Sequence, residues 1–488
     1  MILLFEKFKH RFYGIGVTAV LFIISVIFVC VLFAASIIPL KLMLAGCTLL
    51  LLCVGAVFFL TIDSRRRWRV IIGTVLAAIT LALICVGWYY VHHGVLALEK
   101  ISTPEKEYAH IGVYVKDDDP AQSVTDAKDY TFGILGVLDR DATDKAIKVI
   151  NEKLGKKITV KEYPDIGLLA EALLDGEDIQ AIILNDSFPE LLGETEGYED
   201  YPAKLREIFM AKVEVDDKTD SPEIAPKPAA KYFTVYISGI DCYGSISRRS
   251  RSDVNIIATV NTETGQILLL STPRDYFVPL SISNGIPDKL THAGIYGIQV
   301  SRDTLSMLYD TEIDYYFRVN FDGFEDIIEA LGGITVQSQY SFKSGGISFT
   351  KGENVLDGKS ALVFARERYS LAGGDRQRGK NQMAVISGVI QKATTSTAML
   401  TNYKAVLDGI TGSFETNMPY EYIAELIQSQ LKNGTKWNVV SYSADGTGAS
   451  KKPYSLSSRA YVMIPDQATV DHAKALIEQV KNGKVPTP

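Results

Sequence analysis

The sequence predicts a membrane-anchored α/β protein with three N-terminal transmembrane helices, a small α/β accessory domain and an α/β/α sandwich. Three observations lead to this prediction: uncharged runs near the N-terminus, alternating strand-like and helix-like patterns after them, and a proline-rich segment that divides those patterns. The predicted boundaries are 1–95 for the membrane domain, 104–215 for the accessory domain, 216–231 for a linker and 232–485 for the sandwich. A chain of 488 residues has room for these parts at about 100 to 200 residues per domain.

Uncharged runs cover residues 15–38, 42–61 and 70–91, and the third ends in a tryptophan and two tyrosines. A helix needs about 20 apolar residues to cross the hydrocarbon core, and aromatic residues concentrate at its interfaces. A cleaved signal peptide would have a shorter apolar core followed by a polar chain. Buried helices of a soluble domain would show a polar face, which these runs lack. The runs therefore predict three transmembrane spans.

The cationic residues predict how these spans are oriented. Lys7, Lys9 and Arg11 precede the first span, and four arginines lie between the second and third at positions 65–69, whereas the 39–41 hairpin carries one lysine. Cationic flanks stay in the cytoplasm. The protein is therefore predicted to be a multi-pass cell-membrane protein with a cytoplasmic N-terminus and a large extracellular C-terminal part.

The accessory domain is predicted from short apolar runs that alternate with helical patterns. Strand-like runs cover 111–115, 130–135, 158–160 and 179–184, and helical spacing covers 142–154 and 166–174. The following segment carries Pro222, Pro226 and Pro228 among charged residues and alanines, a composition typical of a linker. No catalytic motif stands out in this part.

The sandwich is predicted from a longer series of the same kind. Strands are expected at 232–237, 254–260, 267–271, 315–319, 334–336 and 437–442. Helices are expected at 300–309, 324–331, 377–394 and 420–432. Strands that alternate with helices favour an α/β/α sandwich.

Composition and motifs exclude several functions. A net charge of -7 argues against a broad basic surface for duplex nucleic acid. Four of the five cysteines lie in the apolar N-terminal region, so Cys242 alone cannot build a disulfide framework or a cysteine zinc site. The motifs GxxxxGK[ST], GxSxG and HExxH are missing, which removes the simplest support for nucleotide, serine-triad or zinc-protease hydrolysis. His292 is a lone histidine, for which a structural role is favoured.

Two aspartates lie next to predicted strand ends. Asp241 follows the 232–237 run, and Asp253 leads into the 254–260 run. Mg²⁺ is often held by one or two carboxylates together with phosphate oxygens of the substrate. The pair is a candidate magnesium site. The alternative is two exposed turn aspartates, one of them paired with Arg251.

A cationic group follows further along the chain. It consists of Arg274, Arg366, Arg368 and Arg378, with Gln382 four residues beyond the last arginine and on the same helical face. Guanidinium groups bind phosphate oxygens bidentately, so this set suits a pyrophosphate. For Arg366 and Arg368, a solvated ion-pair network is the alternative.

Five short strings occur in a fixed order and spacing: Gly239-Ile240-Asp241, Arg251-Ser252-Asp253, Pro273-Arg274-Asp275, Leu331-Gly332-Gly333 and Arg366-Glu367-Arg368, followed by Arg378 and Gln382. Together they resemble the LytR-CpsA-Psr family of cell-wall glycopolymer transferases over about residues 232–396. The three spans and the accessory domain are similar to its capsule-associated streptococcal-type members.

The resemblance implies an α/β/α fold that holds a polyprenyl chain in a hydrophobic tunnel. Asp241 and Asp253 match the positions of the Mg²⁺ ligands. Arg274 is the expected catalytic arginine, and Asp275 beside it is a candidate general base, with an ion-pair or turn role as the alternative. The residues that match the pyrophosphate-binding set are Arg251, Arg274, Arg366, Arg368, Arg378 and Gln382.

The function implied is Mg²⁺-dependent transfer of a glycopolymer, expected to be capsular polysaccharide, from a polyprenyl-pyrophosphate carrier to peptidoglycan. The expected partners are the lipid-linked glycan, peptidoglycan, membrane lipid and capsule-assembly proteins, with no nucleic acid. One alternative is a membrane-bound regulator of capsule or cell-wall synthesis, although the short cytoplasmic parts cannot fold a helix-turn-helix. Another is a glycan-binding organiser of capsule assembly, which would need the arginines but not the metal.

Overall fold

The computed structural model describes residues 2–36, 38–62, 67–103, 106–215, 231–240, 245–395, 412, 414–456 and 458–488. The chain forms two compact units. The first contains the N-terminal helices up to Ser102 and the segment Met418–Lys436. The second contains the accessory and sandwich domains.

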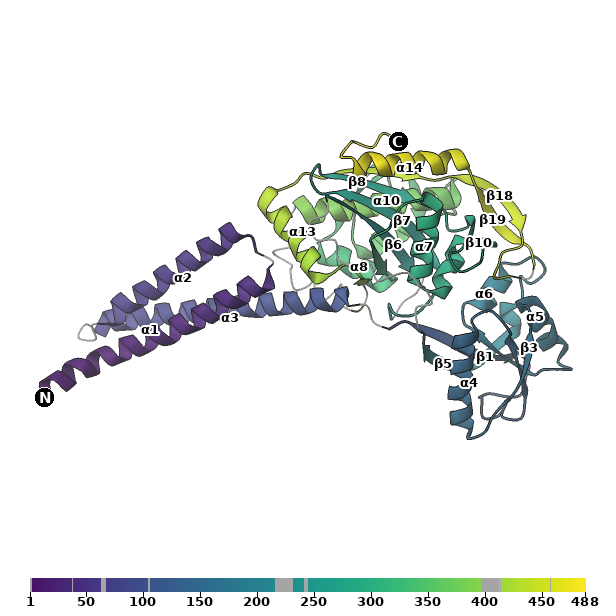
Figure 1. Cartoon of the computed structure of the whole chain (residues 1–488), viewed down its shortest axis with the longest axis horizontal. Coiled ribbons are helices and arrows are strands. Elements are labelled where there is room, and N and C mark those ends of the chain that lie inside the picture. The colour runs from purple at the N-terminus through teal and green to yellow at the C-terminus, as the bar shows by residue number, and fades with distance from the viewer. Residues whose placement is uncertain are drawn as a thin grey trace. The chain divides into compact units, whose positions relative to one another are not determined.

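The first unit is built on three long helices that pack side by side (Figure 1). They are α1 (Ile2–Ala35), α2 (Leu40–Thr61) and α3 (Arg67–Ser102). Leu21, Val57 and Ile84 pack in the small core between them, whereas large apolar side chains cover their outer faces. Within the described residues, these three helices are long and apolar enough to cross a membrane. The three predicted spans are confirmed as apolar helices, although α1 ends at Ala35 and α3 continues to Ser102.

Helix α13 (Tyr420–Asn433) was predicted as part of the sandwich, whereas its contacts in this structure group it with the first unit. The helix belongs to the first unit and packs against α3. The Tyr420 hydroxyl donates to the Ala35 carbonyl, and the Gln428 side chain donates to the Ser36 carbonyl. Helical periodicity predicts an apolar face but does not say which partner covers it.

The accessory domain is a five-stranded sheet with helices on both faces. Its strands are β1 (Tyr108–Lys116), β2 (Thr131–Leu135), β3 (Thr159–Tyr163), β4 (Ala181–Asn185) and β5 (Leu205–Glu214). They lie in the order β3-β2-β4-β1-β5, and β1 is antiparallel to both β4 and β5. Its helices are α4 (Arg140–Leu154), α5 (Ile166–Asp175) and α6 (Phe188–Gly193).

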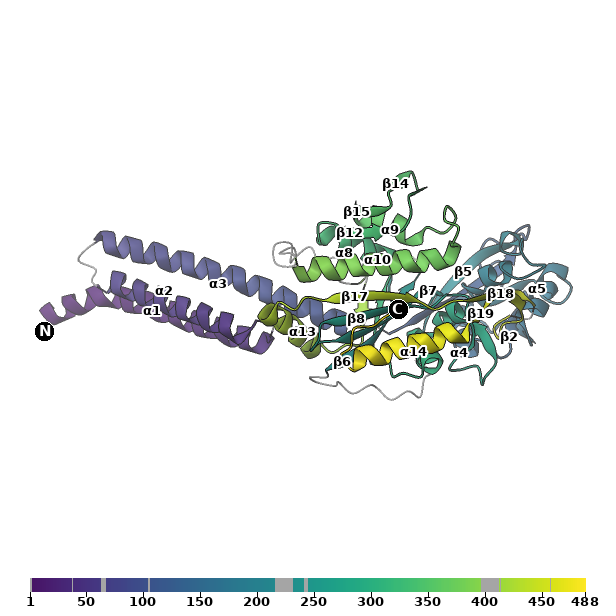
Figure 2. The ribbon, with the colours of Figure 1, turned by 90° about the horizontal axis from the view of Figure 1, so that it is seen from above.

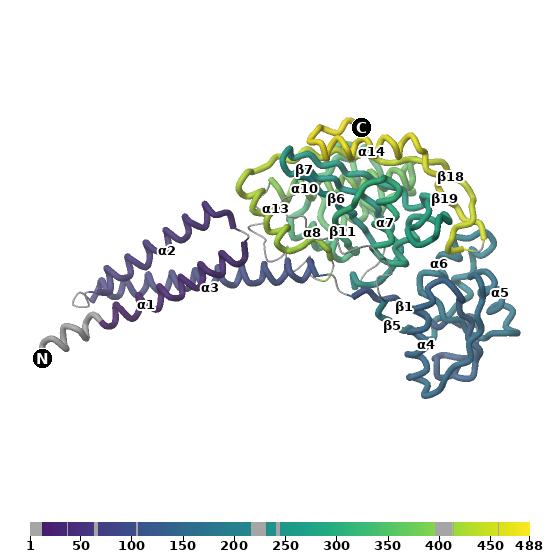
Figure 3. The backbone as a smooth tube through the Cα atoms, in the orientation of Figure 1, coloured from purple at the N-terminus to yellow at the C-terminus, as the bar shows by residue number. Residues whose placement is uncertain are grey.

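Alternation along each strand sends neighbouring side chains to opposite layers. On β1, Val113 packs in the core shared with α4, whereas Tyr114 packs in the core shared with α5 and α6. Figure 3 shows α4 and α5 on the two sides of β1. The predicted strands and helices of this domain are present, but β5 and α6 were not predicted.

The sandwich domain is centred on a six-stranded mixed sheet. Its strands are β6 (Tyr232–Ile240), β7 (Ser252–Asn261), β8 (Gln266–Ser271), β11 (Tyr315–Val319), β16 (Phe414–Thr416) and β17 (Asn438–Ser443). The order is β16-β11-β6-β7-β8-β17. The pairs β6–β11 and β8–β17 are parallel, and the other neighbours are antiparallel.

Helices cover both faces of this sheet, with α10 and α14 on opposite sides (Figure 2). Ile257 and its neighbours pack in the core that includes side chains of α7 and α14, whereas Ile256 packs against the face of α10. The sandwich is therefore confirmed. Its larger helices are α7 (Ile298–Tyr309), α8 (Phe321–Ala330), α9 (Gly358–Arg366), α10 (Gly374–Thr395) and α14 (Gln467–Lys481).

Four short strand pairs complete the domain. The pairs are β9 (Phe277–Pro279) with β10 (Pro287–Lys289), β12 (Ile334–Ser338) with β15 (Gly352–Leu356), β13 (Phe342–Ser344) with β14 (Ile347–Phe349), and β18 (Gly446–Lys451) with β19 (Ala460–Pro465). The second and third pairs share a core with α8, α9 and α10. Asn320 and Asp357 cap α8 and α9 by accepting backbone N–H bonds of 2.8 Å, which fixes where each helix begins.

The accessory and sandwich domains share one hydrophobic cluster. Ile295, Leu456 and Ala460 of the sandwich domain pack in the same core as Leu191 and Leu192 of the accessory domain. The β1 backbone continues this contact, since the Tyr108 N–H donates to the Ser247 carbonyl at 2.9 Å. The two domains are therefore held together by buried apolar contacts and by a backbone hydrogen bond.

Candidate functional site

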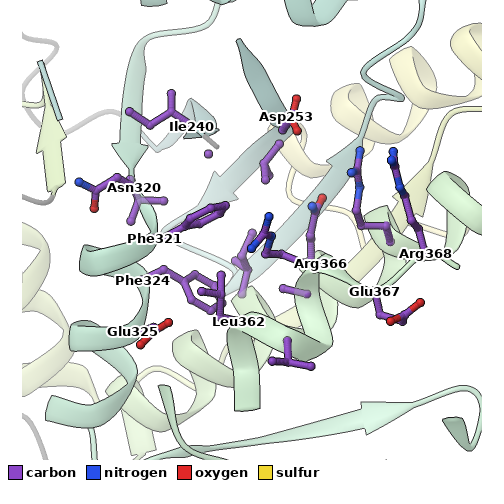
Figure 4. A pocket seen from close by; sticks show the side chains of 18 of the residues that line it. Ile240, Asp253, Asn320, Phe321, Phe324, Glu325, Leu362, Arg366, Glu367 and Arg368 are labelled. Atoms are coloured by element: carbon purple, nitrogen blue, oxygen red, sulfur yellow. The ribbon is translucent and has the colours of Figure 1, made fainter. Parts of the chain in front are cut away.

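A cavity of about 550 Å³ opens beside the sheet of the sandwich domain. Its apolar lining includes Ile237, Val254, Val319, Phe321, Phe324 and Leu362. Its polar lining includes Asp253, Arg274, Arg366, Arg368, Arg378 and Gln382. Figure 4 shows Phe321, Phe324 and Leu362 on one side, with Asp253 and Arg368 on the other. The structure therefore gathers an apolar chamber and a group of arginines around one space.

Arg274 comes from a segment distant in the sequence from the one that supplies Arg366, Arg368 and Arg378. Arg274 follows β8, Arg366 ends α9, and Arg378 lies in the first turns of α10, one turn before Gln382. Gly379 allows α10 to approach β8 closely, because a Cβ there would lie 2.6 Å from the Ser271 hydroxyl oxygen. This close crossing carries Arg378 and Gln382 to the cavity.

Arg274 and Asp253 form the central ion pair of the site. The Arg274 NH1 group donates to both Asp253 carboxylate oxygens at 3.1 and 3.0 Å, and the Thr291 hydroxyl donates to one of them at 3.2 Å. Burial would raise the pKa of Asp253, but the charges of Arg274, Arg378 and Arg251 outweigh it and lower that pKa below its usual value. Asp253 is therefore an ionised carboxylate at neutral pH.

The other arginines of the cavity are held by aromatic rings and a carboxylate. Arg366 lies over the Phe321 ring at 4.3 Å, and Arg368 lies over the Tyr369 ring at 4.7 Å. Arg378 forms an ion pair with Asp375. Stacking uses the flat face of a guanidinium group, whereas its N–H donors lie in the plane. These contacts orient the guanidinium groups beside the cavity, although Arg368 uses one N–H donor on the Tyr369 hydroxyl and Arg378 pairs through its NH2 with Asp375.

Of the predicted site residues that the structure describes, Arg251 and Asp275 do not line the cavity. Arg251 is held by two carboxylates of the accessory domain, with its NH1 2.7 Å from Glu194 and its NH2 2.8 Å from Glu190. Asp275 lies behind Arg274, with its carboxylate 3.7 Å from the Arg274 Nε. Burial raises the pKa of Asp275, partly offset by Lys289 and Arg274.

Of the two predicted Mg²⁺ ligands, the structure describes Asp253, whereas Asp241 lies outside the described residues. Within the described ranges, no three His, Cys, Asp or Glu side chains are grouped as metal ligands. A Mg²⁺ ion that takes most of its oxygens from phosphate and water needs only one or two carboxylates. An ionised Asp253 next to arginines that suit a phosphate fits this way of holding Mg²⁺.

His292 is structural, as the sequence favoured. The side chain is fully buried, and its Nδ1 lies 2.6 Å from the Asp288 carboxylate and 2.8 Å from the Ser455 hydroxyl.

Sequence reasoning missed several residues of the site. Tyr369 is 86% exposed and lines the cavity next to Arg368, and its place directly after the Arg366-Glu367-Arg368 string could have marked it. Lys289 and Glu194 meet beside the site at 2.9 Å. No local pattern identifies that pair, because the two residues come from different domains.

Comparison with known proteins places this arrangement in a family. The family model described as the LytR_cpsA_psr family matches residues 206–476, which is more than half of the chain. The chain is similar to TagU of Bacillus subtilis (strain 168), a protein named polyisoprenyl-teichoic acid–peptidoglycan teichoic acid transferase, with 32% identity over 250 residues, 51% of this chain and 78% of the relative.

Two further similarities have comparable extent. The identically named TagU of Halalkalibacterium halodurans is 32% identical over 254 residues, covering 51% of this chain and 80% of the relative. The crystal structure of B. subtilis TagV is 27% identical, with a TM-score of 0.43, covering 53% of this chain and 99% of that one. The family match and the extent of the TagU similarity show that this chain belongs to the LytR-CpsA-Psr family.

Proposed function

We propose that this protein transfers a glycopolymer from a polyprenyl-pyrophosphate carrier to peptidoglycan. The observation that carries the proposal is the cavity, whose apolar chamber opens beside arginines from three separate segments. An apolar chamber suits a polyprenyl chain, and guanidinium forks suit the pyrophosphate attached to it. The names of the TagU relatives support the same reaction class.

The arginines have a clear chemical role in such a reaction. When an acceptor hydroxyl forms a bond to the glycan-bearing group, the bond to the carrier breaks, the hydroxyl proton passes to water, and negative charge grows on the phosphate that leaves with the polyprenyl chain. Arg274, Arg368 and Arg378 stabilise that charge from fixed positions, which is the main protein contribution to phosphoryl-type transfers. Mg²⁺, held by Asp253 with Asp241 as the predicted second ligand, would supply further neutralisation of the phosphate oxygens.

Arg366 and Gln382 complete the proposed pyrophosphate-binding set inside the cavity. Asp275 was a candidate general base. Its position behind Arg274 favours the ion-pair alternative, in which Asp275 orients the arginine from the side away from the cavity.

The polymer that we propose is capsular polysaccharide. The proposal rests on three apolar helices followed by an accessory domain, the arrangement by which the sequence resembles capsule-associated members of the family. The TagU relatives are named for teichoic acid, so the test offers the full-length protein both lipid-linked donors together with peptidoglycan. Preferred transfer of the capsular repeat is expected, and preferred transfer of the teichoic acid donor would contradict this choice of polymer.

Replacing Arg368 or Arg378 by lysine is expected to lower transfer about 10-fold or more, because a lysine cannot reproduce a bidentate hydrogen bond to phosphate. The measurement is the rate of label transfer to peptidoglycan under identical donor concentrations. Arg459→Lys, at an exposed position outside the cavity lining, is the matched control. Unchanged transfer in both cavity variants would mean that these arginines do not bind the donor.

We also infer that the second unit lies outside the cell, at the outer face of the membrane. The inference rests on the cationic flanks at positions 7–11 and 65–69. A reporter fused after Ser102 is expected to be active only outside the cell, and one fused at Arg66 only inside. The reverse pattern would contradict the orientation and place the cavity on the cytoplasmic side.

A further inference from the structure

Two glutamates of the accessory domain reach the sandwich domain from the end of α6. Glu190 and Glu194 are four residues apart, so their side chains lie on the same side of the turn. One Glu194 oxygen accepts from the Arg251 NH1 at 2.7 Å, and the other accepts from the Lys289 ammonium at 2.9 Å. Among the described residues, the Glu190 carboxylate forms its ion pair with Arg251, at 2.8 Å. Glu194 is therefore the carboxylate that joins the two cations.

The contacts continue from Lys289 to the cavity with alternating charge. The Lys289 ammonium lies 3.6 Å from the Asp275 carboxylate, whose other oxygen lies 3.7 Å from the Arg274 Nε. Arg274 then donates to Asp253 at the cavity. An unbroken series of ion pairs thus connects Glu194 of the accessory domain with the arginine that faces the proposed pyrophosphate site.

Burial makes this series sensitive to the loss of one member. The Lys289 side chain is only 3% exposed, and a buried ammonium is costly unless carboxylates surround it. Burial would raise the pKa of Glu194, but Lys289, Arg251 and Arg274 outweigh it and lower the pKa to about 2. Glu194 is therefore ionised at neutral pH and carries the negative charge of its contact with Lys289.

We propose that Glu194 is a positioning residue of the transferase site, where it holds Lys289 and Arg251 and thereby fixes Asp275 behind Arg274. The inference rests on the proposed function and gives the accessory domain a part in the reaction. Without the Glu194 charge, Asp275 is the carboxylate partner that Lys289 keeps among the residues that the structure describes. The ammonium then moves toward Asp275 and draws that carboxylate away from the Arg274 Nε. Arg274 then keeps its hydrogen bonds to Asp253 but loses the negative charge of Asp275 beside its Nε.

The sign of the kinetic effect separates positioning from simple electrostatics. Removing a negative charge near the cavity makes the local potential more positive, so an anionic donor binds equally well or better. A misaligned Arg274 stabilises the departing phosphate less well, so turnover slows. A loss of positioning therefore lowers kcat without raising KM for the lipid-linked donor.

The experiment compares full-length variants in lipid vesicles. Glu194→Gln keeps the shape of the side chain and removes its charge. We expect kcat to fall about 10-fold, the lower end for residues that orient a ligand of a site, with KM for the donor unchanged or lower. Glu190 forms its ion pair with Arg251. Glu190→Gln is therefore expected to lower kcat less than Glu194→Gln. Glu196→Gln, an exposed glutamate two residues beyond Glu194, is expected to match the wild type.

A double-mutant cycle tests whether the effect passes through Lys289. Lys289→Gln should lower kcat in the wild-type background and add little in the Glu194→Gln background, because both changes break the same series of contacts. Fully additive losses would overturn the proposal. A wild-type kcat per folded molecule in Glu194→Gln, with or without a lower melting temperature, would overturn it as well.

Binding of farnesyl pyrophosphate, measured by calorimetry, distinguishes this inference from the proposed function. The wild type and Glu194→Gln are both expected to bind this probe, and Arg378→Ala is expected to bind it poorly. If the wild type neither binds the probe nor transfers the donor, both the proposed function and the inference fail. If it does both while Glu194→Gln keeps the wild-type kcat, only the inference fails.

Discussion

Replacing Asp253 by asparagine is expected to lower transfer about 10³-fold, at the upper end of the losses seen when one charge-stabilising group is removed. The carboxylate has two roles in the proposed site. It accepts two hydrogen bonds from the Arg274 NH1, and it is the described member of the proposed magnesium pair. Asparagine keeps the size of the side chain but loses the charge on which both roles depend. The rate of transfer by the full-length protein is the measurement.

A matched control and a metal titration make this result specific. Asp303 pairs with Arg302 at 2.8 Å on α7 and does not line the cavity, so Asp303→Asn should transfer at nearly the wild-type rate. Transfer by the wild type should stop with a chelator and return with Mg²⁺, and Asp241→Asn should show a loss similar to that of Asp253→Asn. Wild-type transfer that ignores the chelator would contradict the metal role and leave Asp253 only as the partner of Arg274.

The central elements of the fold could be predicted because their side chains alternate between two buried layers. The strand at Tyr315–Val319 matches its predicted bounds, and the strand at Ser252–Asn261 extends the predicted run by two residues at the N-terminal end and one at the C-terminal end. The hairpin of Gly446–Lys451 with Ala460–Pro465 was not predicted, because its first strand is mostly glycine, serine, threonine and lysine with exposed side chains. A strand that buries little has little apolar pattern to reveal it.

For the site, features that depend on local sequence could be predicted, whereas contacts between distant segments could not. Arg274, Arg366, Arg368 and Arg378 could be predicted as a group, because several guanidinium groups together suit a pyrophosphate, and all four line the cavity. The position of Arg251 could not be predicted, because its partners Glu190 and Glu194 come from another domain. Charge alone also cannot tell which aspartate meets which arginine. The sequence suggested Arg251 as an aspartate's partner, whereas Arg274 binds Asp253.

A second large effect is expected where the two domains of the second unit meet. Glu107 immediately precedes β1, is 8% exposed, and contacts the Arg249 Nε at 2.6 Å and the Arg318 NH1 at 2.7 Å. Replacing Glu107 by alanine leaves two buried guanidinium groups without their shared carboxylate. The free energy of unfolding is expected to fall by about 3–5 kcal/mol, the usual cost of breaking a buried ion pair from one side. Chemical denaturation of the full-length protein in detergent is the measurement.

The surface ion pair Lys106–Glu214 provides the control. Lys106 adjoins Glu107 in the sequence, and Glu214 lies opposite Tyr108 where β5 pairs with β1. Its side chains are 72% and 43% exposed, so Glu214→Gln should change the free energy of unfolding by less than about 1 kcal/mol. An equal loss from both substitutions would contradict a special role for the buried carboxylate.

The pH dependence of stability gives an independent check on Glu107. Burial would raise its pKa, but Arg318 and Arg249 outweigh burial and hold the pKa below the ordinary value of 4.5. A carboxyl with a lowered folded-state pKa stabilises the fold fully above its unfolded-state pKa and loses that effect as pH falls through the folded-state value. The wild type should therefore lose stability on acidification below about pH 4.5, and Glu107→Gln should lose less over the same range. If the free energy of unfolding changes with pH in the same way in the two proteins, Glu107 is not the ionised partner of Arg249 and Arg318.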